Sequence, residues 1–300
     1  MQLLTWLYGN AEMVLMLFKA LIDLVKPKQT LLLLFTALAS YTVAADRQFM
    51  FSTFTLLVAS GLLLISGVTV FNMVLEVDID RIMERTRRRP IPSGVIGRNY
   101  ATLYGMLIYV LGLMLAYMIN AWVVVAGVLA LVFDIVLYTL WLKRRVELSI
   151  IVGGVAGGMP AFGGWCAAVG YPTIESILIA VLVMLWIPMH IWFIAYYYME
   201  DYRRANIPML PVTRGVKVVV KAVMISLFLL LFTVVLMYAR GVLGLITLMF
   251  SIFITALALK RIISFQSNPS KEFAKKLFKV ASPYLVIVFS SMIIEKMLLI

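Results

Sequence analysis

Long apolar runs separated by short polar segments make up most of this chain. Nine of these runs, each about 20 residues long, could cross a hydrocarbon core of roughly 30 Å as α-helices. They lie near residues 30–45, 52–73, 101–119, 121–141, 149–169, 173–197, 216–238, 241–259 and 279–299. The runs are too long and too continuous for barrel strands. The pattern therefore predicts an all-α, polytopic membrane bundle of nine transmembrane helices, forming one integral-membrane domain over residues 1–300.

Basic residues collect on one side of the predicted bundle. Of the 26 lysines and arginines, only Arg47, Arg240 and Lys296 fall outside the N-terminal segment and the connections that follow the even-numbered runs. Cytoplasmic loops of membrane proteins carry an excess of Lys and Arg. We therefore expect a multi-pass protein of the cell membrane with its N-terminus in the cytoplasm and its C-terminus outside. Residues 1–28 lack a signal-peptide pattern and are expected to form an amphipathic helix along the cytoplasmic surface.

Composition narrows the classes of partner. The chain is 64% hydrophobic and carries a net charge of +12, but no soluble basic domain, which argues against nucleic acid and favours contact with anionic membrane lipid. The single cysteine, Cys166, excludes an internal disulfide and a cysteine-based metal site. Small residues over 152–165 predict close helix packing, with room for a bulky substrate as the second interpretation.

The segment from Asn72 to Arg89 holds four acids and five arginines at the end of the second run. Charges near hydrocarbon are costly, so such a cluster indicates a functional site. On a helix, Asn72, Glu76 and Asp80 share one face, whereas Asp78 points elsewhere. Carboxylate and amide oxygens suit Mg²⁺, and arginines suit phosphate. We favour an enzyme site for a diphosphate substrate at the membrane surface over a helix end that merely forms ion pairs as it emerges into water.

These residues resemble the UbiA-type intramembrane prenyltransferase family. The first segment that carries the resemblance reads Asn72-x₃-Glu76-x-Asp78-x-Asp80-Arg-x-Met-Glu84-Arg85-Thr86-x-x-Arg89-Pro90. Three further segments resemble the branch of this family that farnesylates heme b: Lys26-Pro27-Lys28, the stretch from Tyr138 to Trp165, and the stretch from Trp186 to Val212. The resemblance covers roughly residues 24–215, and the last three helices match only in hydropathy.

Several positions depart from the family pattern. Glu76 stands where the family usually has aspartate, and its longer side chain puts the metal position in doubt. Tyr197 stands four residues before Asp201, where the wider family has a second aspartate; this change is similar to the heme branch. Four other departures are Val146, Ser149, Ile187 and Ile191.

The resemblance implies helices around a central cavity and transfer of a farnesyl (polyprenyl) group from its diphosphate to a vinyl group of heme b. It implies Mg²⁺-dependent ionisation to an allylic cation. The expected metal ligands are Asn72, Glu76, Asp80 and Asp201, and the expected diphosphate ligands are Lys26, Arg85, Arg89, Lys143 and Arg144. Tyr138 and Tyr198 are expected to face the cation, and a downstream heme-modifying enzyme is a further expected partner.

His190, the only histidine, has two interpretations. A lone histidine in an apolar run is usually structural, but its motif favours contact with heme or with a water. Asp134, an acid within the fourth run, also has two open interpretations: it caps the cavity, or it pairs with a basic residue.

Two other functions remain open at this point. A related prenyltransferase could use a quinone precursor, a chlorophyll-like molecule or a lipid as acceptor, although the Met-Glu-Arg-Thr and Ile-Pro-Met-Leu-Pro segments argue against it. A transporter or channel for an anionic metabolite would also have a basic cytoplasmic mouth. It would not need acids beside the arginines.

Overall fold

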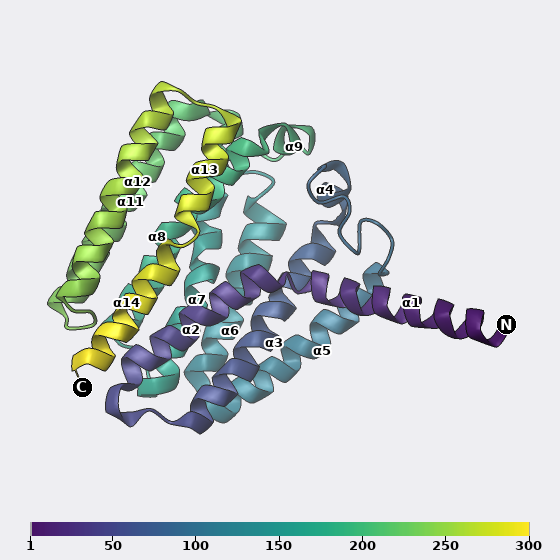
Figure 1. Ribbon diagram of the computed structural model, residues 1–300, viewed down its shortest axis with the longest axis horizontal. Helices are drawn as coiled ribbons and strands as arrows, with labels where there is room; N and C mark the ends of the chain where they lie inside the picture. Colours follow the sequence, from purple (N-terminus) through teal and green to yellow (C-terminus); the bar gives the residue numbers. More distant parts are fainter. Residues whose placement is uncertain (1, 300) are drawn as a thin grey trace.

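The computed structural model describes residues 2–299, apart from the side chains of residues 2–12, 47 and 299. Throughout this part the regular structure is helical (Figure 1). The elements in chain order are α1 (Gln2–Leu24), α2 (Pro27–Ala45), η1 (Asp46–Gln48), α3 (Phe51–Leu75), α4 (Val77–Ile82), α5 (Arg98–Ile119), α6 (Ala121–Leu131), η2 (Val132–Leu142), α7 (Ser149–Val169), α8 (Ile174–Tyr197), α9 (Met199–Arg204), α10 (Leu210–Thr213), α11 (Gly215–Ala239), α12 (Leu245–Ser267), α13 (Lys271–Ala281) and α14 (Tyr284–Leu299).

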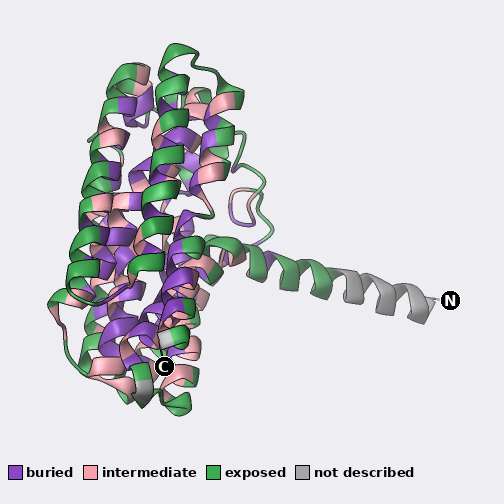
Figure 2. Cartoon of the chain, turned by 60° about the vertical axis from the view of Figure 1, so that its left-hand side comes forward, coloured by how far each residue is buried: buried purple, intermediate pink, exposed green. Residues whose placement is uncertain are grey.

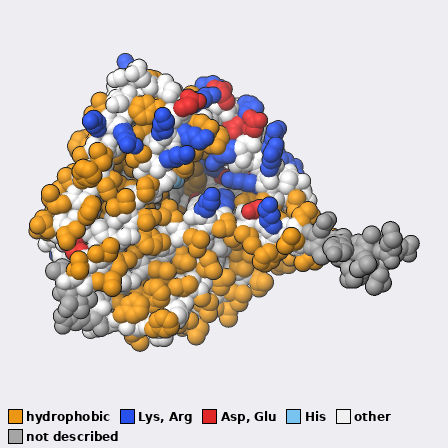
Figure 3. Space-filling view, viewed as in Figure 1, with side chains coloured by type: hydrophobic (Ala, Val, Ile, Leu, Met, Phe, Trp, Pro, Cys, Tyr) orange, Lys and Arg blue, Asp and Glu red, His pale blue; other side chains and the backbone are white. Residues whose placement is uncertain are grey.

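Within the described residues, nine segments are long and apolar enough to cross a membrane, which confirms the predicted all-α, multi-pass class. They are α2, α3, α5, α6 with η2, α7, α8, α11, α12, and α13 with α14. Apolar side chains cover the sides of the bundle, and charged side chains gather at one end (Figure 3). That end carries the loops that follow α3, η2, α8 and α12.

The last two spans differ from their predicted bounds. We predicted that the eighth helix ends at residue 259, but α12 continues to Ser267 and includes Lys260 and Arg261. Long basic side chains can carry their charge outward along a helix, so the first charge need not end it. The lysines expected in the following loop lie on α13, whose Ala274 and Leu277 face the core.

Helix α7 lies at the centre of the packing, against α2, α6 and α8. A methyl group added at Gly164 would overlap the carbonyl oxygen of Ala37 on α2. One added at Gly158 would lie 2.5 Å from the carbonyl oxygen of Ala180 on α8. The glycines of α7 therefore let three helices approach closely, as the packing interpretation predicts. Buried residues fill the space between the helices, and exposed residues face outward (Figure 2).

Helix α1 projects sideways from the charged end of the bundle (Figure 1). Of its described side chains, Ala20 and Leu24 in the last turns join the core, where they pack with Val70 and Val74 of α3. Lys26, in the left-handed region with φ 44°, then turns the chain into α2. The predicted amphipathic character of residues 1–28 falls partly on side chains outside the described residues, and that part stays a prediction.

Candidate active site

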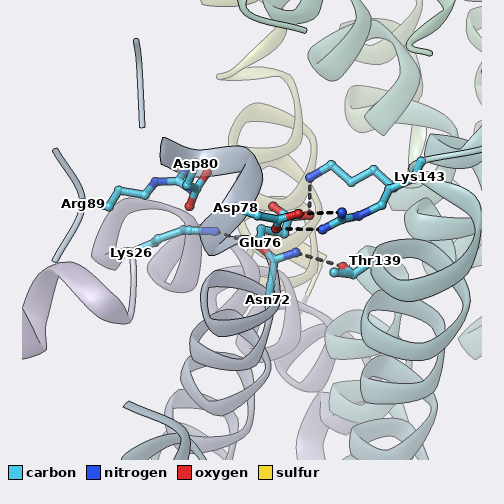
Figure 4. A network of polar contacts seen from close by, with 9 residues as sticks. Lys26, Asn72, Glu76, Asp78, Asp80, Arg89, Thr139 and Lys143 are labelled. Carbon is cyan, nitrogen blue, oxygen red and sulfur yellow. Dashed lines mark hydrogen bonds and ion pairs between the residues drawn. The ribbon is translucent and has the colours of Figure 1, made fainter. Parts of the chain in front are cut away.

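A polar cluster that is partly buried joins the charged ends of α2, α3, α4 and η2 (Figure 4). We call it the inner cluster, and it consists of Lys26, Asn72, Glu76, Asp80, Arg89, Thr139 and Lys143. Its members come from four separate parts of the sequence. Only the close packing of the helix ends brings them together.

The three predicted metal ligands of the first segment do share one side of the chain. Helix α3 ends at Leu75, and Glu76 leaves helical geometry before α4 begins. Helical spacing survives the break, because the Glu76 N–H donates to Asn72 O at 3.1 Å and the Asp80 N–H to Glu76 O at 2.7 Å. Glu76 and Asp80 are buried, whereas the side chain of Asp78 is 61% exposed. Asp78 therefore points elsewhere, as predicted.

Each polar group of this face has a basic or hydroxyl partner. Lys143 donates a hydrogen bond to Glu76. Arg89 Nη1 donates to both carboxylate oxygens of Asp80, at 2.9 and 2.7 Å. Lys26 Nζ donates to Asn72 Oδ1 at 3.1 Å, and Asn72 Nδ2 donates to Thr139 Oγ1 at 3.0 Å. Three of the predicted diphosphate ligands therefore lie against the predicted metal ligands, and together they compensate buried charge.

The predicted fourth span changes its winding halfway. Residues Val132–Leu142 form a π-helix, and the Lys143 N–H still donates to Tyr138 O, five residues back, at 2.8 Å. A π-helix shifts the side chains that follow it relative to an α-helix, and such segments are frequent at functional sites. The buried Tyr138 ring packs on Gly153, and Lys143 Nζ lies 5.4 Å from the ring centre. Asp134 also belongs to this segment.

Burial and mutual attraction set the charges of the inner cluster. Burial would raise the pKa of Glu76, but Lys143, followed by Lys26 and Arg89, holds that pKa below its usual value of 4.5. Burial would lower the pKa of Lys143, but Glu76 raises it above 10.5. Burial, followed by repulsion from Arg89, lowers the pKa of Lys26 from 10.5 to about 8. At neutral pH the cluster therefore holds an ionised glutamate between protonated lysines.

The second predicted site segment packs against the loop after α4. Asp201 Oδ2 accepts a hydrogen bond from the Arg85 N–H at 3.1 Å, and Oδ1 accepts from Arg204. Burial would raise the pKa of Asp201, but backbone N–H groups and Arg204 lower it. The guanidinium of Arg85 stands 5.1 Å from the centre of the Tyr198 ring. Asp201 thus bonds to this loop and to Arg204 on its own helix, and not to the inner cluster.

His190 lies in an aromatic environment apart from the inner cluster. Its ring stacks on Trp186 at a centroid distance of 4.5 Å and tilts against Phe278 at 4.4 Å. Among the described residues, no hydrogen-bond partner reaches its buried Nδ1. The Nε1 atoms of Trp165 and Trp192 are also buried without a partner. A buried polar atom of this kind points to a ligand or a water that the side chain can bind.

Three further observations complete the site. Arg144 forms a fork with Asp78, at 2.7 and 2.9 Å, and so lies outside the inner cluster. Within the described part of the chain, no three His, Cys, Asp or Glu side chains gather closely enough to hold a metal by themselves. Thr139 was not predicted as a site residue. Its position next to Tyr138 in the central motif was the only signal for it.

The fold and the inner cluster define a multi-pass membrane protein with buried acids and bases at one end of its helical bundle. Residues 33–283 match the UbiA prenyltransferase family, and the chain belongs to this family. It is therefore a prenyltransferase, as predicted.

Individual relatives agree with this assignment. The chain is 42% identical to the protoheme IX farnesyltransferase of Korarchaeum cryptofilum (strain OPF8) over 92% of its own length and 93% of the relative's. Its fold is similar to a structure of digeranylgeranylglyceryl phosphate synthase, with a TM-score of 0.77 and 20% identity, over 93% of this chain and 98% of the other. It is also similar to a UbiA homologue from Archaeoglobus fulgidus bound to GPP and Mg²⁺, with a TM-score of 0.62 and 16% identity, over 91% and 99% of the two chains.

Proposed function

We propose that this protein transfers a farnesyl group from farnesyl diphosphate to a vinyl group of heme b. The vinyl electron pair forms the new carbon–carbon bond, water adds the hydroxyl group and releases a proton, and pyrophosphate leaves. The observation that carries the proposal is the 42% identity, over nearly the full length of both chains, with a protoheme IX farnesyltransferase. The inner cluster adds acids and bases suited to a diphosphate at the membrane surface.

The oxygen donors of the inner cluster fit Mg²⁺. Two buried carboxylates and an amide oxygen stand on successive turns, and this ion prefers such ligands while it keeps several waters. Asn72, Glu76 and Asp80 would hold it, with Asp201 as a candidate from the second segment. Once bound, Mg²⁺ would supply positive charge that stabilises the departing pyrophosphate.

The bases of the inner cluster would bind the diphosphate. Lys26 and Lys143 offer compact charges, and Arg89 offers a planar fork that matches phosphate oxygens. Arg89 already pairs with Asp80 and Lys143 with Glu76, and Lys26 donates to the amide oxygen of Asn72. Arg85 would approach from the loop that Asp201 holds. The contacts of Arg144 with exposed Asp78 support a role outside this cluster.

The allylic cation needs surroundings that exclude water and offer the faces of aromatic rings. Tyr138 is 8% exposed and adjoins Lys143, so its ring is available next to the proposed diphosphate position. Tyr198, whose ring lies under the guanidinium of Arg85, is a second candidate to face the allylic cation. His190 would contact heme, through the iron, a propionate or a bound water. Its partnerless Nδ1 in an aromatic pocket supports this role.

The membrane orientation follows from charge. The end with the inner cluster also carries most of the basic side chains (Figure 3), so it would face the cytoplasm, with the N-terminus on that side and the C-terminus outside. Residues 1–300 would act as one domain, with residues 1–28 along the cytoplasmic surface. A downstream enzyme that modifies the farnesylated heme would be a partner, since the product is too apolar to cross water freely.

Two alternatives make different predictions. A prenyltransferase with a quinone precursor or a lipid as acceptor would keep the inner cluster but would not need His190 in its aromatic pocket. An anion transporter would need the bases but not the buried carboxylates that neutralise them.

The test is product formation by membranes that contain the protein, supplied with heme b, farnesyl diphosphate and Mg²⁺ and analysed by mass spectrometry. We expect a hydroxyethylfarnesyl heme, lost on chelation of Mg²⁺ and reduced at least about a hundredfold by Asp80→Asn. Glu84→Gln removes an exposed acid of the same segment and is expected to keep full activity.

The outcomes separate the alternatives. Farnesylation of a quinone precursor or a lipid, without any heme product, would overturn the acceptor and keep the site. An Asp80→Asn variant as active as Glu84→Gln would overturn the role of the inner cluster. Geranyl and geranylgeranyl diphosphates, supplied in parallel, measure the preferred chain length.

A further inference from the structure

A pocket opens beside the inner cluster, between α3, α4, α5 and the end of η2. It has a volume of about 330 Å³, and Val74, Leu75 and Val77 supply its apolar lining. Its charged lining consists of Arg81, Arg98, Arg144 and Asp78. We call it the outer pocket. Three arginines against one carboxylate leave a net charge of +2 around a concave surface.

The outer pocket and the inner cluster use opposite faces of one helical segment. The lining residues on α3 and α4 stand at positions 74, 75, 77, 78 and 81, whereas the inner cluster uses positions 72, 76 and 80. At about 100° per residue the two sets are centred on opposite sides of the helix. Exposure agrees, since the side chain of Asp78 is 61% exposed and that of Glu76 only 5%. A ligand in the outer pocket would therefore not occupy the proposed reaction site.

The arginines of the outer pocket are available to an anion. Asp78 orients Arg144 through two hydrogen bonds. Among the side chains that the structure describes, Arg81 and Arg98 have no carboxylate within 4.0 Å. Guanidinium groups bind phosphate in a bidentate manner, and several around one pocket fit a phosphate better than a dispersed basic surface does.

The surface next to the pocket identifies the kind of phosphate. Arg98 begins α5, and the apolar side chains that follow on this helix are exposed, with Leu103 at 66%, Leu107 at 58% and Val110 at 46%. An exposed apolar side on a membrane-spanning helix faces lipid. We propose that the outer pocket binds the phosphate headgroup of an anionic membrane lipid, whose acyl chains lie along α5. Free pyrophosphate could bind the same arginines, but it has no apolar part that could cover the exposed side of α5.

The experiment uses the purified full-length protein in detergent and native mass spectrometry to count bound molecules. The probes are dioleoylphosphatidylglycerol, dioleoylphosphatidylcholine and sodium pyrophosphate, each titrated alone. The pocket variant is Arg81→Gln/Arg98→Gln. The control variant, Arg87→Gln/Arg88→Gln, removes the same charge from exposed positions of the neighbouring loop, outside the pocket. Reaction of buried Cys166 with a thiol reagent on heating checks that each variant is folded.

We expect one phosphatidylglycerol molecule to bind at least tenfold more tightly than phosphatidylcholine. That binding should weaken at least tenfold in the pocket variant and less than twofold in the control. Equal weakening in both variants would mean attraction to the basic surface as a whole and would overturn the site. Pyrophosphate binding that depends on Arg81 and Arg98, without such dependence for phosphatidylglycerol, would overturn the lipid. Because Arg81 and Arg98 are outside the inner cluster, failure here leaves the heme product of the proposed function unaffected.

Discussion

Removal of one partner from the Glu76–Lys143 ion pair should destabilise the protein strongly. The side chains are only 5% and 12% exposed, so either one left alone is a buried charge without its main partner. Breaking a buried pair typically costs 3–5 kcal/mol. Because Lys26 and Arg89 still attract Glu76, we expect the lower end, about 3 kcal/mol, for Lys143→Met.

The double variant separates the ion pair from simple loss of contacts. Glu76→Gln combined with Lys143→Met leaves no lone charge at this position. We expect it to cost about 1 kcal/mol, far less than the sum of the two single variants. The exposed pair of Asp78 and Arg144 provides the matched control. Its side chains are 61% and 42% exposed, and its single variants should each cost under about 1 kcal/mol.

The chain contains its own reporter for this cycle. Cys166 is the only cysteine and is fully buried, so a fluorogenic thiol reagent reacts with it only when the bundle opens. The measurement is the midpoint of heat unfolding in detergent for the wild type, the two single variants and the double variant. Additive losses in the double variant, or single losses no larger than those of the exposed pair, would refute the reasoning.

Three further predictions use the same protein. Gly164→Ala should lower the unfolding midpoint by the equivalent of about 1–3 kcal/mol, because its methyl group would meet backbone of α2. Gly154→Ala, whose methyl group would lie 3.2 Å from the Met184 side chain and 3.3 Å from its carbonyl oxygen, makes no contact under 3.0 Å and should lower the midpoint less. Glu295→Ala should cost about 1–2 kcal/mol by the same assay, since the carboxylate accepts three backbone N–H groups at the start of α12. Hydrogen bonds from Arg214 and Thr213 lower the pKa of Glu147 below 4.5. The ionised Glu147 therefore stabilises α10 above pH 4.5, and this stabilisation is lost as the pH falls through the lowered pKa. Hydrogen exchange of residues 210–213 should therefore be faster in Glu147→Gln than in the wild type at pH 7 and should become equal on acidification.

The sequence by itself determined the spans and the face of the first site segment. Hydropathy over about 20 residues is a local property, so nine spans could be located before any packing was known. The spacing of Asn72, Glu76 and Asp80 is also local, and hydrogen bonds on both sides of the break at Glu76 preserved it. The predicted end of a span was wrong where a charged residue was taken as the end of the helix. This happened at Lys260, which lies inside α12.

Only the tertiary structure decided which groups meet. Lys143 reaches Glu76 across 67 residues of sequence, and Asp201 contacts the backbone of Arg85 across 116. These pairings depend on where packed helix ends lie, which no local pattern specifies. The π-helical turn before Lys143 belongs here too, because hydropathy does not distinguish five-residue from four-residue hydrogen bonding. Local energetics therefore fixed which segments are helices, and long-range packing fixed the chemistry at their ends.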